Sequence, residues 1–274
     1  MSKWRPSPLN CHYVIPDIHG AYDCLTLILD RILPLRKSDG GKDHLVFLGD
    51  YIDRHKDSHK VIDTLIELKT KFPEQVTLLM GNHEYMLLQA LNLVPGFNFS
   101  PATKFHAHRM WMKNGGVDTL LGYYERKMGY QKSVDEVPLF RVSEFIPKEH
   151  LQFLQSLQKY HETEEYIFVH GGCYTAQPLS STSLEEIVWD RSLFKHVLTE
   201  LKNKTYAPTW DKTIVCGHSS ISSNQPIITE KYMMLDCGAP HQLLAVELNS
   251  MEAFMASPLK KRLVKYSLTE TVLT

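Results

Sequence analysis

The sequence predicts an α/β fold in which two mixed β-sheets form a central sandwich flanked by helices, with a mainly helical insertion near the functional site. Strand-like and helix-like segments alternate up to about residue 91, and short strand-like segments dominate from residue 165 onward. Residues 92–147 break the alternation and are rich in aromatic, His, Gly and Pro residues. We expect this stretch to cap the mouth of the site, within one domain spanning residues 1–274.

In the N-terminal part, three apolar strands are each expected to lead into a helix. The strands are predicted at residues 12–16, 45–48 and 76–80. The first helix, residues 23–36, has apolar residues at the i, i+3, i+4, i+7 spacing of one buried face. Ser58 is a candidate N-cap for the second helix, and the third is expected to begin near Glu84.

The C-terminal part is expected to hold one more helix and the strands of the second sheet. The helix is predicted at residues 147–159 and the strands at 166–169, 213–216, 232–235 and 242–248. Residues 249–274 are predicted to be a C-terminal tail that lies on the surface or frays.

Composition narrows the classes of partner. Thirty basic and 31 acidic residues give a net charge of −1, which supports neither a nucleic acid nor a membrane as the main partner. Five scattered cysteines without a Cys-x-x-Cys pair are expected to be reduced thiols of a cytoplasmic protein. Neither a signal peptide nor a spanning segment is expected. The oligomeric state is left open.

Polar motifs follow several of the apolar runs, so their side chains should meet at one edge of the sheets. The motifs are Asp17-Ile18-His19-Gly20, Gly49-Asp50-Tyr51-Ile52-Asp53-Arg54, Gly81-Asn82-His83-Glu84, His170-Gly171-Gly172 and Gly217-His218-Ser219. Oxygen and imidazole ligands without a thiolate suit Mn, Fe, Zn or Mg. The set predicts a hydrolytic site that binds two divalent metal ions.

Together these motifs resemble the calcineurin-like metallophosphoesterases, and in particular the serine/threonine phosphoprotein phosphatase (PPP) family. The resemblance covers residues 13–248. Two Trp-containing segments, residues 111–116 and 189–191, fall where the bacterial branch of that family has such motifs.

The resemblance implies a role for each motif residue at the metal site. Asp50 matches the carboxylate that bridges the two ions.

 Mn is the expected ion. Asp17 and His19 would complete the first metal position beside Asp50. The other three expected ligands, Asn82, His170 and His218, would complete the second.

His83 is assigned to catalysis rather than to metal binding. By the family motif it protonates the leaving oxygen, while Asp53 holds its other ring nitrogen. The alternative is structural, with Asp53 as an N-cap and His83 as a residue of the helix start.

Two arginines are assigned to the substrate phosphate, because a guanidinium fork matches phosphate oxygens. Arg54 matches the first phosphate clamp of the family and Arg191 the second clamp of the bacterial branch. A surface salt bridge of Arg191 with Asp190 or Glu186 is the alternative. Glu84 is interpreted as orienting histidines or backbone groups.

Three residues depart from the family pattern. Pro16 replaces a Gly before Asp17, His55 replaces the Gly after Arg54, and Ser219 replaces a common Thr. His55 places a side chain beside the phosphate clamp, so its consequence is expected to fall on the range of substrates.

The expected function is a dinuclear-metal phosphatase that hydrolyses phosphate monoesters by direct attack of metal-bound hydroxide. A serine/threonine or dual-specificity protein phosphatase is favoured, with phosphorylated proteins or small phosphate esters as substrates. Two alternatives are a symmetrical dinucleoside tetraphosphate hydrolase and a catalytically silent binding module. Aromatic residues of the insertion fit either an adenine platform or the core of a helical cap.

Overall fold

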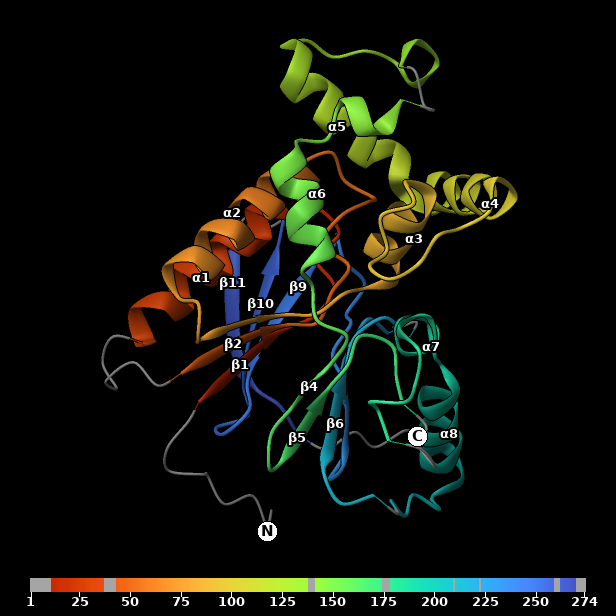
Figure 1. Ribbon diagram of the computed structural model, residues 1–274. Coiled ribbons are helices and arrows are strands. Elements are labelled where there is room, and N and C mark those ends of the chain that lie inside the picture. The colour runs from red at the N-terminus through yellow and green to blue at the C-terminus, as the bar shows by residue number, and fades with distance from the viewer. Residues whose placement is uncertain are drawn as a thin grey trace.

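The computed structural model describes residues 11–36, 43–137, 141–173, 178–208, 210–221, 223–258 and 262–269. It contains two mixed sheets packed face to face, with helices on the outer face of each (Figure 1). The expected α/β sandwich is confirmed. None of the helices in the described ranges is long and apolar enough to cross a membrane.

The first sheet has six strands in the order β11-β10-β9-β1-β2-β3. Its strands are β1 (His12–Ile15), β2 (His44–Phe47), β3 (Val76–Leu78), β9 (Leu243–Glu247), β10 (Glu252–Ser257) and β11 (Arg262–Ser267). β1, β2 and β3 run parallel, whereas β9 is antiparallel to β1. The parallel strands require crossover connections, which α1 (Tyr22–Arg36) and α2 (Ser58–Lys71) supply.

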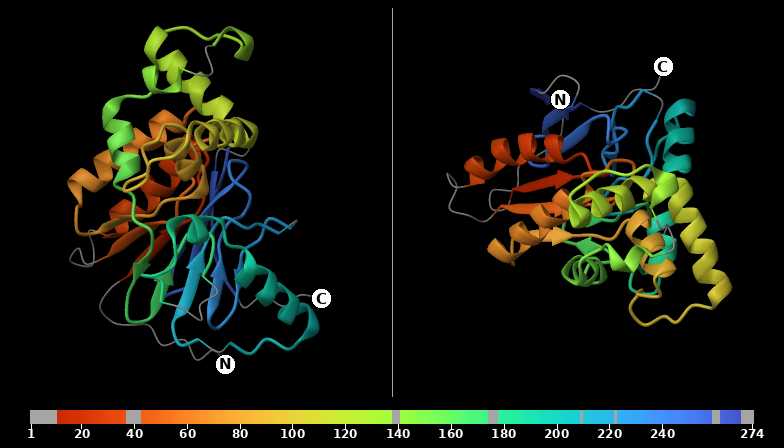
Figure 2. Two further views of the ribbon diagram at one scale, coloured as in Figure 1. Left: turned by 45° about the vertical axis from the view of Figure 1, so that its right-hand side comes forward. Right: turned by 90° about the horizontal axis from the view of Figure 1, so that it is seen from above.

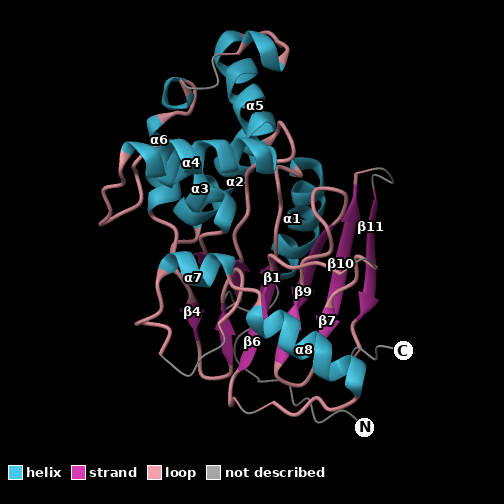
Figure 3. Cartoon of the chain, turned by 90° about the vertical axis from the view of Figure 1, so that its right-hand side faces the viewer, coloured by secondary structure: helices cyan, strands magenta, loops and turns pink. Residues whose placement is uncertain are grey.

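The second sheet has five strands in the order β4-β5-β6-β8-β7. Its strands are β4 (His161–Glu162), β5 (Tyr166–Phe168), β6 (Thr213–Cys216), β7 (Ile227–Ile228) and β8 (Tyr232–Met234). β5, β6 and β8 are parallel, and the two short edge strands are antiparallel to their neighbours. Figure 3 shows α7 (Leu184–Trp189) and α8 (Ser192–Asn203) lying over this sheet.

Alternation of side chains along the strands divides the core into layers. In β1, Val14 packs between the two sheets, whereas Tyr13 and Ile15 pack toward the helices of the first sheet. β2 repeats the pattern, with Val46 inside the sandwich and Phe47 on the helix side. Both faces of these strands are therefore buried, which explains their nearly continuous apolar sequences.

The insertion is helical, as expected. α3 (Asn82–Ala90) is followed by α4 (Pro101–Trp111), the π-helical turn η1 (Met112–Gly116), α5 (Val117–Met128), the 3₁₀ turns η2 (Val134–Glu136) and η3 (Val142–Glu144), and α6 (Lys148–Gln155). Ser100 caps α4 by accepting from the Thr103 N–H, and Pro101 occupies the first turn. In Figure 2, left, α4 (yellow) and α5 (yellow-green) lie at the opposite end of the molecule from α8 (teal).

The expectation of a frayed C-terminal tail is wrong for residues 252–257 and 262–267. These two segments form β10 and β11, which extend the first sheet by antiparallel pairing after β9. Alternate residues of β10 pack on opposite faces: Ala253 faces the interior of the sandwich, while Phe254 and Ala256 face the helices. The alternation spans few residues and uses small side chains, so its sequence signal is weak.

The burial of Phe254 predicts that the C-terminal strands contribute to stability. Phe254→Ala removes a fully buried ring that also lies 5.5 Å from the Arg31 guanidinium. We expect the free energy of unfolding to fall by about 3–5 kcal/mol, the usual cost of such a cavity. Val264→Ala on β11 is the matched control, because Val264 is 40% exposed. Equal urea midpoints for the two variants would contradict the assignment of β10 to the core.

Candidate metal centre

The six expected metal ligands lie just beyond the carboxyl ends of five strands. Asp17 and His19 follow β1, Asp50 follows β2, Asn82 follows β3, His170 follows β5 and His218 follows β6. All six side chains are buried. Strand ends from both sheets thus place these groups in one interior site.

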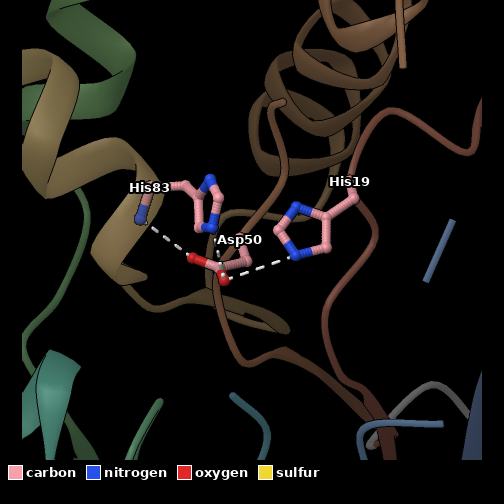
Figure 4. A group of neighbouring side chains, drawn as sticks. All are labelled: His19, Asp50 and His83. Atoms are coloured by element: carbon pink, nitrogen blue, oxygen red, sulfur yellow. Dashed lines mark hydrogen bonds and ion pairs between the residues drawn. The ribbon is translucent and has the colours of Figure 1, made fainter. Parts of the chain in front are cut away.

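Asp50 lies between two groups of possible ligands. Its Oδ2 is 3.5 Å from His19 Nε2, and its Oδ1 is 3.3 Å from His170 Nε2. Within the described residues, the first group able to hold a cation is His19, Asp50 and His83, and the second is Asp50, His170 and His218. Figure 4 shows the His19 and His83 rings turned toward the Asp50 carboxylate from two sides. The shared carboxylate is the geometry that two neighbouring ions require.

The two remaining expected ligands complete these groups. Asp17 Oδ2 lies 4.0 Å from His19 Nε2, and Asn82 Oδ1 lies 3.1 Å from His170 Nε2. The structure therefore brings together all six residues that the sequence singled out.

The histidine rings present acceptor nitrogens to the centre of the site. His19 Nδ1 lies 2.9 Å from the Ile52 carbonyl and His170 Nδ1 lies 2.8 Å from the Leu48 carbonyl. Because a carbonyl only accepts, each Nδ1 must donate, and the lone pair is left on Nε2. His19 Nε2 and His218 Nε2 are buried without a hydrogen-bond partner among the described residues. Such orphaned nitrogens beside carboxylates fit a cation.

Burial and neighbouring charges shift the pKa values of the candidate ligands in both directions. Burial, with Asp236 and Asp50 nearby, raises the pKa of Asp17 well above its usual value. Burial and the neighbouring His170 lower the pKa of His218 to about 2, so its ring is neutral. Burial also opposes the ionisation of Asp50, but His170 and His83 outweigh this effect and hold its pKa well below the usual range. Asp50 and His218 are therefore in the forms that bind divalent ions, a carboxylate and a neutral imidazole. At His170 burial lowers the pKa but Asp50 raises it to about 9, so a cation bound there would displace a proton, as it would at Asp17.

His83 and Asp53 form a buried pair at the edge of this cluster. His83 Nδ1 lies 2.6 Å from Asp53 Oδ2, which is a short, charge-assisted hydrogen bond. Burial lowers the pKa of His83, but the carboxylates of Asp50 and Asp53 outweigh it and leave the pKa above its usual value. The pair therefore has the arrangement of a general acid held by a carboxylate.

The two candidate phosphate-binding arginines lie on different loops beside the cluster. Arg54 Nη2 is 3.3 Å from His83 Nε2, and Arg191 Nη1 donates to Ser219 Oγ at 3.2 Å. Among the described residues, no ion pair joins Arg191 to its alternative partners: Asp190 accepts from Ser192 through Oδ1, and Glu186 accepts from Ser183. Arg191 is thereby directed to the loop that carries His218.

Glu84 anchors the loops rather than facing the centre. Its carboxylate accepts the backbone N–H groups of Asp50, Tyr51, Ile52 and Gly81 at 2.8–3.2 Å. The expectation that Glu84 orients backbone groups is confirmed. This single side chain ties the loop after β2 to the loop after β3.

Five site residues adopt left-handed backbone conformations, which cost energy for residues with a Cβ. They are His19, Asp50, Asp53, Arg54 and His218, with φ between 47° and 75°. Backbone strain of this kind persists only where surrounding contacts enforce it. Its concentration in these loops marks them as functional.

Some features had no clear sequence signal. Trp111 Nε1 and Thr119 Oγ1 both donate to Asp53 Oδ1, at 2.9 and 2.8 Å. The sequence singles out Trp111 only as part of the Trp-containing segment 111–116. Thr119 has no pattern that distinguishes it from other polar residues of a helix. Asp236 Oδ1 accepts from the Gly238 N–H at 2.8 Å and so stabilises the turn after β8.

Comparisons with known proteins match the part of the chain that carries the site residues. The family model "Calcineurin-like phosphoesterase" matches residues 13–235. A 98-residue segment is 37% identical to the serine/threonine-protein phosphatase SIT4 of Candida albicans and covers 36% of this chain. A 99-residue segment is 35% identical to the serine/threonine-protein phosphatase PP1-delta of Caenorhabditis elegans, again with 36% of this chain covered. Each match spans only 30% of the relative's own length.

Two solved structures resemble the fold over almost the whole chain. A mutant cold-active protein tyrosine phosphatase has a TM-score of 0.54 and 18% identity, covering 97% of this chain and 85% of that chain. A putative diadenosine tetraphosphatase has a TM-score of 0.51 and 16% identity, covering 96% of this chain and 95% of that chain. These likenesses establish the fold, and the family match over residues 13–235 establishes the kinship. The chain belongs to the calcineurin-like phosphoesterases.

Proposed function

We propose that the protein is a dinuclear-metal phosphatase that hydrolyses phosphate monoesters, in the manner of a bacterial-type serine/threonine or dual-specificity protein phosphatase. The observation that carries the proposal is the Asp50 carboxylate, which is shared by two groups of ligands and lies 3.8 Å from His83 Nε2. The candidate metal positions and the candidate proton donor, His83, therefore both adjoin the Asp50 carboxylate.

The donor set assigns the ions to two positions. Asp17, His19 and Asp50 would hold one ion, and Asp50, Asn82, His170 and His218 would hold the other. When bound, the ions would lower the pKa of a water molecule and neutralise charge on the phosphoryl group. Mn²⁺ is the proposed ion, with Fe, Zn and Mg as the other metals that suit these ligands.

The protein's own groups then account for orientation and for proton transfer. In this proposal Arg54 and Arg191, which lie beside His83 and Ser219, hold the phosphoryl oxygens, with the ester oxygen toward His83. His83, oriented through Nδ1 by Asp53, supplies a proton to that leaving oxygen. Phosphate is proposed to pass directly to water, so no side chain becomes phosphorylated.

Two observations favour a protein phosphatase over a dinucleotide hydrolase. Two curated relatives that are more than 30% identical over a segment of this chain are serine/threonine-protein phosphatases. The Trp-containing segments also lie at the site, because Trp111 donates to Asp53 and the Trp189 ring packs edge-on to His218. The silent binding module is disfavoured, since an inactive protein would have no need of a complete ligand set.

A substrate panel tests this choice. With Mn²⁺ added, we expect phosphoserine peptides and p-nitrophenyl phosphate to be hydrolysed with a kcat/KM at least about tenfold above that for diadenosine tetraphosphate, a difference of about 1.4 kcal/mol in transition-state binding. A cyclic nucleotide completes the panel, and chelated protein serves as the blank. A tenfold preference for the dinucleotide would overturn the protein-phosphatase proposal and support the dinucleotide hydrolase.

A further inference from the structure

One turn of the insertion packs against the loop that carries Asp53 and Arg54 and is hydrogen-bonded to it. The turn consists of the end of α4, η1 and the first residues of α5, spanning residues 111–119, and we call it the insertion turn. Trp111 and Thr119, at its two ends, are both fully buried. Asp53 and Arg54 lie in a different part of the chain, the loop between β2 and α2.

The insertion turn occupies one oxygen of the Asp53 carboxylate completely. Trp111 Nε1 donates to Asp53 Oδ1 at 2.9 Å and Thr119 Oγ1 donates to the same atom at 2.8 Å. The Asp53 backbone N–H donates back to Thr119 Oγ1 at 2.8 Å. The other oxygen, Oδ2, is left for His83 Nδ1 at 2.6 Å. Two donors on Oδ1 fix the rotation of the carboxylate and so aim Oδ2 at the imidazole.

The same turn holds the backbone of Arg54. The Arg54 N–H donates to the Gly115 carbonyl at 3.2 Å. Gly115 has φ of +105°, and a Cβ there would lie 2.7 Å from the Arg54 nitrogen. Only glycine permits this approach. Asp53 and Arg54 have φ of 75° and 64°, and the contacts of the insertion turn help to enforce these conformations.

We propose that Trp111 and Thr119 are positioning residues for the reaction: they fix the Asp53 carboxylate so that it orients His83 toward the leaving oxygen. The inference rests on the proposed function and deepens it. The insertion is then a part of the catalytic apparatus as well as a cover for the site. Neither residue touches substrate, so their effect acts through Asp53 and His83.

The inference predicts a loss that depends on the leaving group. Trp111→Phe keeps the ring but removes the N–H, and Thr119→Val keeps the shape but removes the hydroxyl. Each is expected to lower kcat on a phosphoserine peptide by about 10–100-fold, the usual loss when a group that orients a reacting side chain is removed. KM should stay within about twofold, because no substrate contact is lost. On p-nitrophenyl phosphate the loss should be much smaller, since that leaving group hardly needs a proton.

Matched controls separate positioning from general damage. Trp210→Phe removes an indole donor that bonds the Lys231 carbonyl at 2.8 Å, and Thr229→Val removes a buried hydroxyl that contacts Tyr206. Both lie on the second-sheet side of the molecule and are expected to leave both substrates unaffected. Thr119→Ser restores the hydroxyl and should recover most of the lost kcat. Equal losses on the two substrates, or unchanged kcat in both test variants, would refute the inference.

A spectroscopic measurement tests the geometry without turnover. In ¹⁵N-labelled protein loaded with diamagnetic Zn²⁺, the His83 Nδ1 proton should give a downfield signal because of its short bond to Asp53. Trp111→Phe and Thr119→Val should shift or broaden it, whereas Trp210→Phe should not. An unchanged signal in both test variants refutes the inference. If the wild-type protein hydrolyses no phosphate monoester, the proposed function fails, and this measurement still decides the positioning role. If either Trp111→Phe or Thr119→Val does not fold, the other variant is used for both the kinetic and the spectroscopic measurement.

Discussion

Replacing Asp50 with Asn is expected to remove at least one of the two metal ions and to lower kcat by more than about 100-fold, since altering even an outer partner of a metal ligand costs 10–100-fold. Asp50 alone contributes to both groups of ligands, with Oδ2 3.5 Å from His19 Nε2 and Oδ1 3.3 Å from His170 Nε2. The amide of Asn has one oxygen and no charge. It can serve one position at most.

The electrostatics of the site strengthen this expectation. Although burial opposes ionisation, His170 and His83 keep the pKa of Asp50 well below its usual range, so the carboxylate is charged. Loss of that charge leaves neighbouring imidazoles without their anionic partner and removes the attraction for a second cation.

Metal content after loading with Mn²⁺ and gel filtration provides the measurement, alongside kcat on p-nitrophenyl phosphate. Asp30→Asn is the control, because Asp30 is an exposed carboxylate on α1 and should leave both quantities unchanged. Retention of two ions per chain and full activity by Asp50→Asn would show that Asp50 does not bridge. Full activity of the wild-type protein after exhaustive chelation would contradict the metal requirement itself.

The candidate ligand residues could be predicted because the pattern that marks them lies in the neighbouring sequence. Each follows a short apolar strand, and strand ends collect at the edge of a sheet, so Asp17, Asp50 and His170 could be placed together without knowledge of tertiary contacts. The two-sheet architecture was equally accessible, because buried parallel strands have nearly continuous apolar sequences.

Contacts between distant segments could not be predicted. Thr119 is 66 residues from Asp53, and its hydroxyl looks like any polar group on an amphipathic helix. The left-handed conformation of Asp53 and Arg54 is likewise imposed by neighbours, since Arg disfavours it and Asp adopts it only occasionally. The same reason explains β10: its strand character comes from pairing with β9 more than from the β-propensity of its small residues.

Replacing His83 with Asn is expected to separate proton transfer from metal binding. We expect kcat on a phosphoserine peptide to fall by about 10²–10⁴-fold, the usual contribution of a general acid, with the metal content unchanged. On p-nitrophenyl phosphate the loss should be much smaller, because its leaving group departs without a proton. His196→Asn on α8 is the control, since this partly exposed residue pairs with Glu200 away from the cluster.

Metal content is the decisive measurement, because the geometry alone admits two roles for His83. Its Nε2 lies 3.8 Å from Asp50 Oδ2, close enough to join His19 and Asp50 around a cation. One contact favours the acid, because Nδ1 is held by Asp53 at 2.6 Å. The Arg54 guanidinium, 3.3 Å from Nε2, opposes any positive charge at that nitrogen, a proton as well as a metal ion, and so does not decide between the two roles. A variant that loses one ion per chain, with equal losses of kcat on the peptide and the aryl ester, would make His83 a ligand and remove the proposed proton donor from the mechanism.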